Sequence, residues 1–246
     1  MATLGSSSGA FHRQSTLEDP LAHLPRSTIL EYRKGQSIYT QAQPSPGICL
    51  IIAGTVKVCR VANDGRQVVA DIYRVDEFFG ESVLLGPAHL PEQAIALANT
   101  RIMAWTAGQM EEIVAGRPKL AVAIWQVLVQ RNLDFAQRIE SFSLDNVARR
   151  LARSLIRLAE RLGAPAENGS VQMTALTHEL LSQYVGTSRE GITYHMNYFR
   201  KKGCLRYSRK GITLYRDVFE EWLRQDDSHV DQPYPGQHRP TDTASL

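Results

Sequence analysis

The stretch VGTSREGITYHMNYFRKKG, residues 185–203, joins a tight turn to a short amphipathic helix. Residues 185–187 form the expected turn, because their central glycine adopts positive φ angles at little steric cost. Ile192, Met196 and Phe199 recur at helical spacing after the turn, so they share one face and are expected to point into a core. The opposite face carries a polar set, which comprises Arg189, Glu190, Thr193, Tyr194 and Asn197.

A second short helix precedes the turn, near residues 177–184, with Thr177 as its expected cap and Ser188 as the cap of the helix that follows. Two short helices joined by a three-residue turn containing glycine form a helix-turn-helix. A hairpin, LRYSRKGITLYR, comes next and carries Arg209 and Lys210 at its tip. The alternative is an ordinary helical hairpin whose polar face is solvated.

The polar face has the chemistry to read DNA. An arginine donates two hydrogen bonds to guanine O6 and N7, and a glutamate accepts one from cytosine N4. Arg189 and Glu190 together would therefore read a G·C-rich step. Ser188 and Thr177 lie at helix starts, whose free amides bind phosphates. Arg209 and Lys210 would flank the groove as a wing, and Tyr194 and Asn197 complete the predicted DNA-binding set.

Basic charge is concentrated in the same part of the chain. Residues 144–224 hold 14 Lys and Arg against 8 Asp and Glu, whereas residues 1–143 hold 13 of each. A local basic excess is expected of a segment that meets phosphate, although a solubilising surface would also produce it. The N-terminus has no signal-peptide pattern and no apolar run is long enough for a membrane span, so we expect a cytoplasmic protein without a membrane partner.

The first half of the chain reads as a β-domain followed by a long helix. Residues 27–107 contain short β-rich runs separated by turn residues, and Asn-Asp-Gly at 63–65 is a strong hairpin signal. From residue 119 the period becomes helical for roughly 35–40 Å. The apolar stripe of this helix predicts either a two-chain coiled coil or packing on its own β-domain. Its members are Leu120, Ile124, Leu128, Phe135, Ile139 and Phe142, with Arg131 in the same line.

A joint at residues 142–145 separates this helix from the next, for which Ser143 or Asp145 is the expected cap. We divide the chain accordingly, with disordered ends. The parts are 1–20, a β-domain at 21–116, the long helix and hinge at 117–143, the helix-turn-helix part at 144–224, and a tail at 225–246.

Residues 174–215 resemble the winged helix-turn-helix of the cyclic-AMP-receptor / fumarate-nitrate-regulator (CRP/FNR) superfamily, and the resemblance extends over about residues 28–224. It is carried by the GTSRE motif, the IIAGTVKV strand turn and the DEFFGES segment. The resemblance implies an α+β fold: a cyclic-nucleotide-binding-like β-roll of the jelly-roll type, a long dimerisation helix and the winged helix. It also implies a homodimeric transcription regulator that binds palindromic double-stranded DNA, with RNA polymerase as a further partner. Arg189 and Glu190 match the family's base readers, but Tyr194 stands where the cyclic-AMP receptor branch has a cation.

The same resemblance places an effector pocket in the β-roll. Gly80, Glu81 and Ser82 match the ribose-binding turn, but Glu92 and Gln93 align with the Arg-Ser pair that holds the cyclic phosphate. Residues 75–100 contain no Lys or Arg at all. Phe135 replaces a polar residue of the long helix that contacts the purine, and Arg131 is expected to pair with Glu81. A cyclic phosphate would thus lack its charge-assisted partner, which argues against ordinary cyclic-AMP control. A cyclic-nucleotide-dependent regulator with an altered phosphate site is the alternative.

Other effectors and function classes fit less well. An iron–sulfur cluster needs four thiolates, and the β-domain holds only Cys49 and Cys59. These two are symmetric about Gly54, so a redox pair across a hairpin is a further hypothesis. His89, in a loop, is a poor haem ligand, and the effector stays unidentified. The one histidine in residues 27–107 excludes a cupin-type metalloenzyme, and we expect no enzyme. A regulatory module of a kinase or channel would not need the winged helix.

Overall fold

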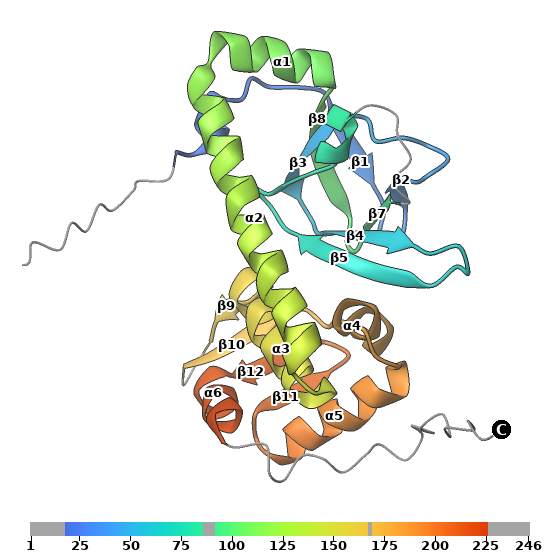
Figure 1. Cartoon of the computed structure of the whole chain (residues 1–246), viewed down its shortest axis with the longest axis vertical. Helices are drawn as coiled ribbons and strands as arrows, with labels where there is room; N and C mark the ends of the chain where they lie inside the picture. The colour runs from blue at the N-terminus through green and yellow to red at the C-terminus, as the bar shows by residue number, and fades with distance from the viewer. Residues whose placement is uncertain (1–17, 86–91, 167–168, 226–246) are drawn as a thin grey trace, which may run out of the picture.

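The computed structural model describes residues 18–85, 92–166 and 169–225, and its upper part is a β-roll of two four-stranded antiparallel sheets (Figure 1). The strand orders are β1-β8-β3-β6 and β2-β7-β4-β5. The strands are β1 (Ile29–Tyr32), β2 (Ser37–Tyr39), β3 (Ile48–Ala53), β4 (Val56–Val61), β5 (Gln67–Tyr73), β6 (Phe78–Phe79), β7 (Glu92–Ala96) and β8 (Thr100–Trp105). Two short 3-10 helices, η1 (Pro20–His23) and η2 (Glu81–Leu85), accompany them. The predicted jelly-roll type of domain is confirmed.

The strands pack their inner faces into one apolar core. Ile51, Val56, Phe79 and Ile102 are fully buried between the two sheets. The predicted hairpin at residues 63–65 joins β4 to β5, and Gly65 has a φ of 83°, as such a turn requires.

The hypothesis that Cys49 and Cys59 face each other across a hairpin is wrong. Cys49 lies on β3, which pairs with β6 and β8, whereas Cys59 lies on β4, which pairs with β5 and β7. Gly54, midway between them in the sequence, lies where the chain passes from one sheet to the other. Equal spacing from Gly54 therefore does not make the two cysteines cross-strand neighbours.

Two helices lead out of the β-roll, α1 (Ala107–Gly116) and the long α2 (Pro118–Leu144). One face of α2 packs on the β-roll, where Leu120 and Ala123 are fully buried and Ile124 joins the cluster around Trp105. The sequence stripe therefore mixes two faces. Leu120 and Ile124 cover the β-roll of their own chain, so neither belongs to the exposed face expected of a dimer helix.

The exposed face of α2 is apolar as well. Trp125 is 71% exposed and Val129 is 54% exposed. Leu128, Phe135, Ile139 and Phe142, predicted from the sequence, are also exposed, and so are Val122 and Leu133.

The C-terminal part is a small sheet packed on four helices. The helices are α3 (Val147–Leu162), α4 (His178–Val185), α5 (Arg189–Lys201) and α6 (Arg216–Arg224). The sheet has the order β11-β12-β10-β9, with β9 (Ala164–Pro165), β10 (Ser170–Met173), β11 (Leu205–Ser208) and β12 (Gly211–Tyr215). Its core includes Leu151, Leu181, Ile192, Phe199 and Phe219, all fully buried.

The joint between α2 and α3 differs in detail from the prediction. Asn146, and neither Ser143 nor Asp145, caps α3 by accepting a hydrogen bond from the backbone N–H of Arg149 at 3.0 Å. Asp145 instead accepts from Ser141 at 2.5 Å and pairs with Arg153 at 2.9 Å. Most of the two ends predicted to be disordered, residues 1–17 and 226–246, lies outside the described residues.

Candidate nucleic-acid interface and effector pocket

The helix-turn-helix is formed by α4, a turn and α5, and both predicted caps are present. Thr177 accepts a hydrogen bond from Leu180 N and Ser188 accepts one from Gly191 N, each at 3.0 Å. Gly186 ends α4 in the left-handed conformation, with φ 71° and ψ 54°. A Cβ on Gly186 would lie 2.6 Å from the ring of Phe142 at the end of α2, so the turn is packed directly against the joint.

The reading face of α5 is open. Ile192, Met196 and Phe199 are buried as predicted, which leaves Arg189 and Glu190 exposed at the start of the helix. Tyr194 is 41% exposed and packs edge-on against His195, with 5.1 Å between the ring centroids. An arginine and a glutamate side by side at an uncovered helix start are available to the edges of bases.

Asn197, one turn further along this face, is held by a residue that the sequence did not indicate. The Tyr207 hydroxyl of β11 donates to Asn197 Oδ1 at 3.1 Å, and the Arg200 guanidinium lies 5.6 Å from the Tyr207 ring centroid. Tyr207 thus couples the wing to the reading helix. A tyrosine in a hairpin strand has no sequence signal for this role.

His178, the first residue of α4, connects the two helices. Its Nδ1 lies 2.8 Å from Thr193 Oγ1, and Thr193 Oγ1 donates to the carbonyl oxygen of Arg189 at 2.9 Å. Burial, together with the positive charge of Arg189, lowers the pKa of His178 below its ordinary value.

The predicted phosphate contacts lie around the reading face. Ser188, Thr177, Arg209 and Lys210 are exposed, and the last two occupy the tip between β11 and β12. Thr177 and the two wing cations also line a cleft of about 1030 Å³ between the C-terminal part and the β-roll. The other basic residues that line the cleft are Lys34, Lys57, Arg74 and Arg161, against the acidic pair Asp76 and Glu179.

In the β-roll, several of the predicted effector residues are bound to other residues of the chain. Arg131 of α2 pairs with Glu81 at 2.8 Å, as the sequence suggested, and also donates to the carbonyl oxygen of Phe78. Glu92 accepts a hydrogen bond from the Tyr39 hydroxyl at 2.5 Å. Burial and the nearby carboxylates of Glu92 and Glu81 raise the pKa of Tyr39, so the phenol stays protonated and donates.

Buried aromatic rings pack around these pairs. Phe79 stacks between Tyr39 and Tyr73, with 6.1 Å to each ring centroid, and Arg131 lies 4.8 Å from the centroid of Tyr73. Gln93 donates to Ser37 Oγ at 3.2 Å. Gly80 has a φ of 81°, Ser82 lies in η2, and Phe135 lies on α2 with Arg138 6.0 Å from its ring centroid. Tyr39 is the residue of this site that the sequence did not indicate.

The cysteines of the described residues are buried and free. Burial raises the pKa of the Cys49 thiol to about 12 and that of Cys204 to about 11. His89 lies outside the described residues. Within the described ranges, no group of three or more His, Cys, Asp or Glu is placed to hold a metal ion, and no helix is long and apolar enough to cross a membrane.

The fold and the open reading helix together define a DNA-binding regulator with a separate β-roll domain. Residues 29–117 match the family of cyclic nucleotide-binding domains, and residues 149–216 match the family of Crp-like helix-turn-helix domains. The chain belongs to the CRP/FNR family of transcription regulators.

Named relatives agree with this assignment. The CRP-like cAMP-activated global transcriptional regulator of Mycobacterium tuberculosis is 26% identical over 186 residues, which cover 75% of this chain and 83% of the relative. The global nitrogen regulator of Synechococcus elongatus is 24% identical over 192 residues, covering 77% and 86%. A CRP/FNR-family regulator from Thermus thermophilus shares the fold, with a TM-score of 0.65 and 24% identity over 80% of this chain and 99% of that chain.

Proposed function

We propose that this regulator binds a palindromic DNA site as a homodimer, reads it with Arg189 and Glu190, and does not respond to cyclic AMP in the usual way. The open reading face of α5 is the observation that supports DNA reading. Thr177, Ser188, Arg209 and Lys210 would hold phosphates, and Tyr194 and Asn197 would contact the outer bases. RNA polymerase is the further partner we expect of a transcription regulator, and the cytoplasm is its expected location.

The exposed seam of α2 supports the homodimer. Its residues follow alternating steps of three and four, the spacing of a coiled-coil core. They are Val122, Trp125, Val129, Asn132, Ala136 and Ile139, all exposed in the single chain. A stripe in which Asn132 is the one polar residue needs a cover, and a second copy of α2 supplies one of matching shape. A dimer would present two reading helices, which must lie about 34 Å apart to enter successive major grooves.

The carboxylate of Glu92 argues against ordinary cyclic-AMP control. By the family resemblance it aligns with a phosphate-binding cation, and it accepts a hydrogen bond from the neutral phenol of Tyr39. A cyclic phosphate there would meet a like charge with no compensating cation. Arg131, the nearby cation, is already paired with Glu81. The pocket residues therefore do not fit the phosphate in the usual manner.

A cyclic-nucleotide-dependent regulator with an altered phosphate site is the second candidate. One observation favours it: the relative in Mycobacterium tuberculosis is named as cAMP-activated and is 26% identical to this chain. In that case the Arg131–Glu81 pair would open, so that Arg131 could face the phosphate.

The deciding experiment selects binding sites from a random DNA pool by sequencing, using the full-length protein with and without cyclic AMP. A palindrome enriched equally under both conditions supports the proposal. A palindrome that requires cyclic AMP supports the second candidate. Enrichment of no sequence would refute DNA reading by α5.

A further inference from the structure

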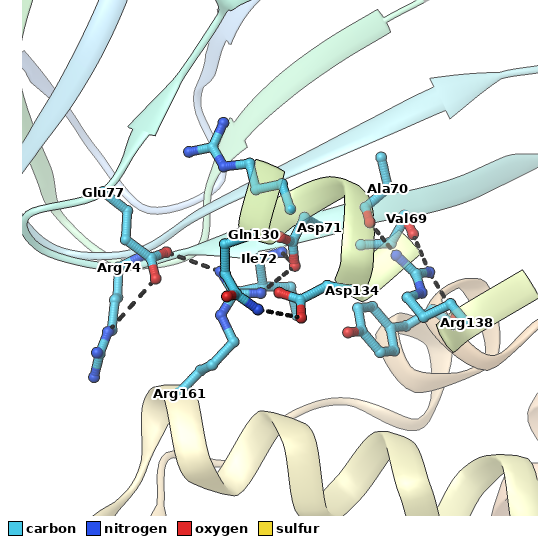
Figure 2. Close-up of polar contacts among 12 residues, drawn as sticks. Val69, Ala70, Asp71, Ile72, Arg74, Glu77, Gln130, Asp134, Arg138 and Arg161 are labelled. Atoms are coloured by element: carbon cyan, nitrogen blue, oxygen red, sulfur yellow. Dashed lines mark hydrogen bonds and ion pairs between the residues drawn. The ribbon is translucent and has the colours of Figure 1, made fainter. Parts of the chain in front are cut away.

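Strand β5 of the sensor packs against α4, and Arg138 of α2 and Arg161 of α3 also bind it (Figure 2). Arg138 of α2 donates to the carbonyl oxygen of Val69 at 3.0 Å and to that of Ala70. It also donates to the carbonyl oxygen of Tyr184 at 3.3 Å, and its guanidinium lies 4.4 Å from the Tyr184 ring centroid. One side chain thus joins a sensor strand to α4 of the helix-turn-helix.

The second arginine comes from the DNA-binding part itself. Arg161, near the end of α3, pairs with Asp71 of β5 at 2.6 Å and with Glu77 at 2.9 Å (Figure 2). The Arg161 side chain is 21% exposed and that of Asp71 is 12% exposed. Asp71 also accepts a hydrogen bond from the backbone N–H of Ile72 at 2.8 Å, which fixes the carboxylate. This forked contact is more directional than a surface ion pair.

Apolar packing adds to the contacts that Arg138 and Arg161 make between the sensor and the helix-turn-helix. Cys59, Val69 and Ile72 of the sensor are fully buried in the same cluster as Leu181 and Tyr184 of α4. The helix that docks on the sensor is therefore α4, and this arrangement leaves α5 uncovered. A buried ion pair adds little net stability, but losing one partner leaves a buried charge, so such pairs favour one arrangement over others.

The segment whose carboxylates bind Arg161 also contains Glu81, one of the predicted effector residues. Glu77 immediately precedes β6, and Glu81 follows that strand by two residues. Arg131 of α2 binds this segment at the carbonyl oxygen of Phe78 and at Glu81. Residues 71–81 therefore carry the contact to α3 at one end and the pocket carboxylate at the other.

We propose that Arg161 and Arg138 are positioning residues through which strand β5 holds the helix-turn-helix with its reading face open, and that residues 71–81 convey the state of the pocket to this contact. The inference rests on the proposed DNA-binding function. Anything that displaces Glu81 shifts Glu77, and with it the orientation of α3 and of the reading helix. Such a coupling requires that both sites bias the same two-state arrangement.

The first test measures the affinity of full-length variants for the selected palindrome. Arg161→Met keeps the apolar stem but loses both ion pairs, and we expect operator affinity to fall by about tenfold, within the range of interdomain couplings. Arg161→Lys keeps one cation and should recover part of that loss. Arg224→Met is the matched control, since it removes a cation of the same domain whose ion-pair partner is Glu220, on its own helix. It should bind within about twofold of the unaltered protein.

Two further readouts separate positioning from plain stability. Glu77→Gln removes one carboxylate and keeps its shape, so it should weaken operator binding while circular dichroism shows a folded protein. If Arg161→Met and Glu77→Gln lower the melting temperature but leave operator affinity unchanged, the positioning role is refuted. Unchanged operator affinity in every variant would also refute the positioning role.

The link to the pocket is tested by combining Arg161→Met with Glu81→Gln. Conveyance through residues 71–81 predicts that the double variant loses less affinity than the sum of the two single losses, expressed as free energies. Additive losses would refute conveyance. These failures differ from failure of the proposed function, because in that case the unaltered protein would select no palindrome and Arg189→Ala would change nothing.

Discussion

At the scale of single residues, Arg189 is the side chain on which sequence reading depends most directly. It is exposed at the first position of α5, and a bidentate contact to guanine distinguishes bases by about 1–3 kcal/mol. We expect Arg189→Ala to lose preference for the selected palindrome while keeping salt-sensitive binding to any DNA. Titration of specific and random duplexes at two salt concentrations measures this, with Arg224→Ala as the control. An equal loss on both duplexes would contradict the base-reading role.

The three thiols give a second prediction at this scale. Cys49, Cys59 and Cys204 are buried, and burial raises the pKa of each thiol, to about 12 for Cys49 and about 11 for Cys204. Because the thiolate is the reactive form, we expect none of them to react with an aromatic disulfide reagent at pH 8 in the native protein. All three should react in guanidinium chloride. Fast labelling of Cys49 or Cys59 in the folded state would contradict their burial.

Which residues could be predicted from sequence follows from how far apart the partners lie in the chain. Thr177 and Ser188 cap amides three residues away, so local pattern was sufficient for them. Tyr39 and Glu92 meet across 53 residues, and no local signal pairs them. The Arg131–Glu81 pair could be predicted because the family resemblance placed both residues near one expected pocket.

At the scale of elements, α2 shows why a stripe of apolar residues is ambiguous. Helical spacing predicted an amphipathic helix correctly, but α2 is apolar on two faces. Leu120 faces the β-roll, whereas Val129 faces solvent. Periodicity alone cannot divide such residues between two partners, because a helix apolar on most of its circumference has no single preferred face. The packing against Trp105 and Met110 settled the division.

The solvent face of α2 is testable by a single charge. Val129→Asp places a carboxylate in the centre of the proposed seam, where burial of an unpaired charge is unfavourable. We expect monomers by sedimentation and weak half-site binding. Gln137→Asp, on the neighbouring polar flank of the same helix, should leave the assembly unchanged. If Val129→Asp sediments as the unaltered protein does, α2 is not the interface.

The turn of the helix-turn-helix depends on one glycine. Gly186→Ala forces a side chain into the left-handed region, which costs about 1–2 kcal/mol. The added Cβ would also meet the Phe142 ring at 2.6 Å, at the junction with α2. We expect urea unfolding to show a loss of at least that size. Gly116→Ala is the control, because nothing lies within 4 Å of a Cβ there. Equal stability of the two variants would contradict the strained turn.

At the scale of the whole molecule, the mutual arrangement of sensor and DNA-binding part was beyond sequence reasoning. Arg161 and Asp71 are 90 residues apart, and both belong to ordinary amphipathic patterns of their own elements. The family resemblance supplied the order of the parts but not the contact between them. This contact depends on side chains far apart in the sequence, which only the packed structure brings together.

Two histidines of the C-terminal part contribute to the dependence of stability on pH. His195 of α5 has its pKa lowered by burial, and His178 has its pKa lowered by burial and by Arg189. A histidine whose pKa is lower in the folded than in the unfolded state binds more protons when the protein unfolds. With respect to this histidine, the protein therefore has its full stability above the unfolded pKa of about 6.5. Stability is then lost as the pH falls from there towards the folded pKa. We expect the melting temperature to decline as the pH falls below about 6.5, and His195→Gln to make that decline less steep. Because Gln cannot titrate, an unchanged pH profile in His195→Gln would show that this histidine does not couple protons to folding.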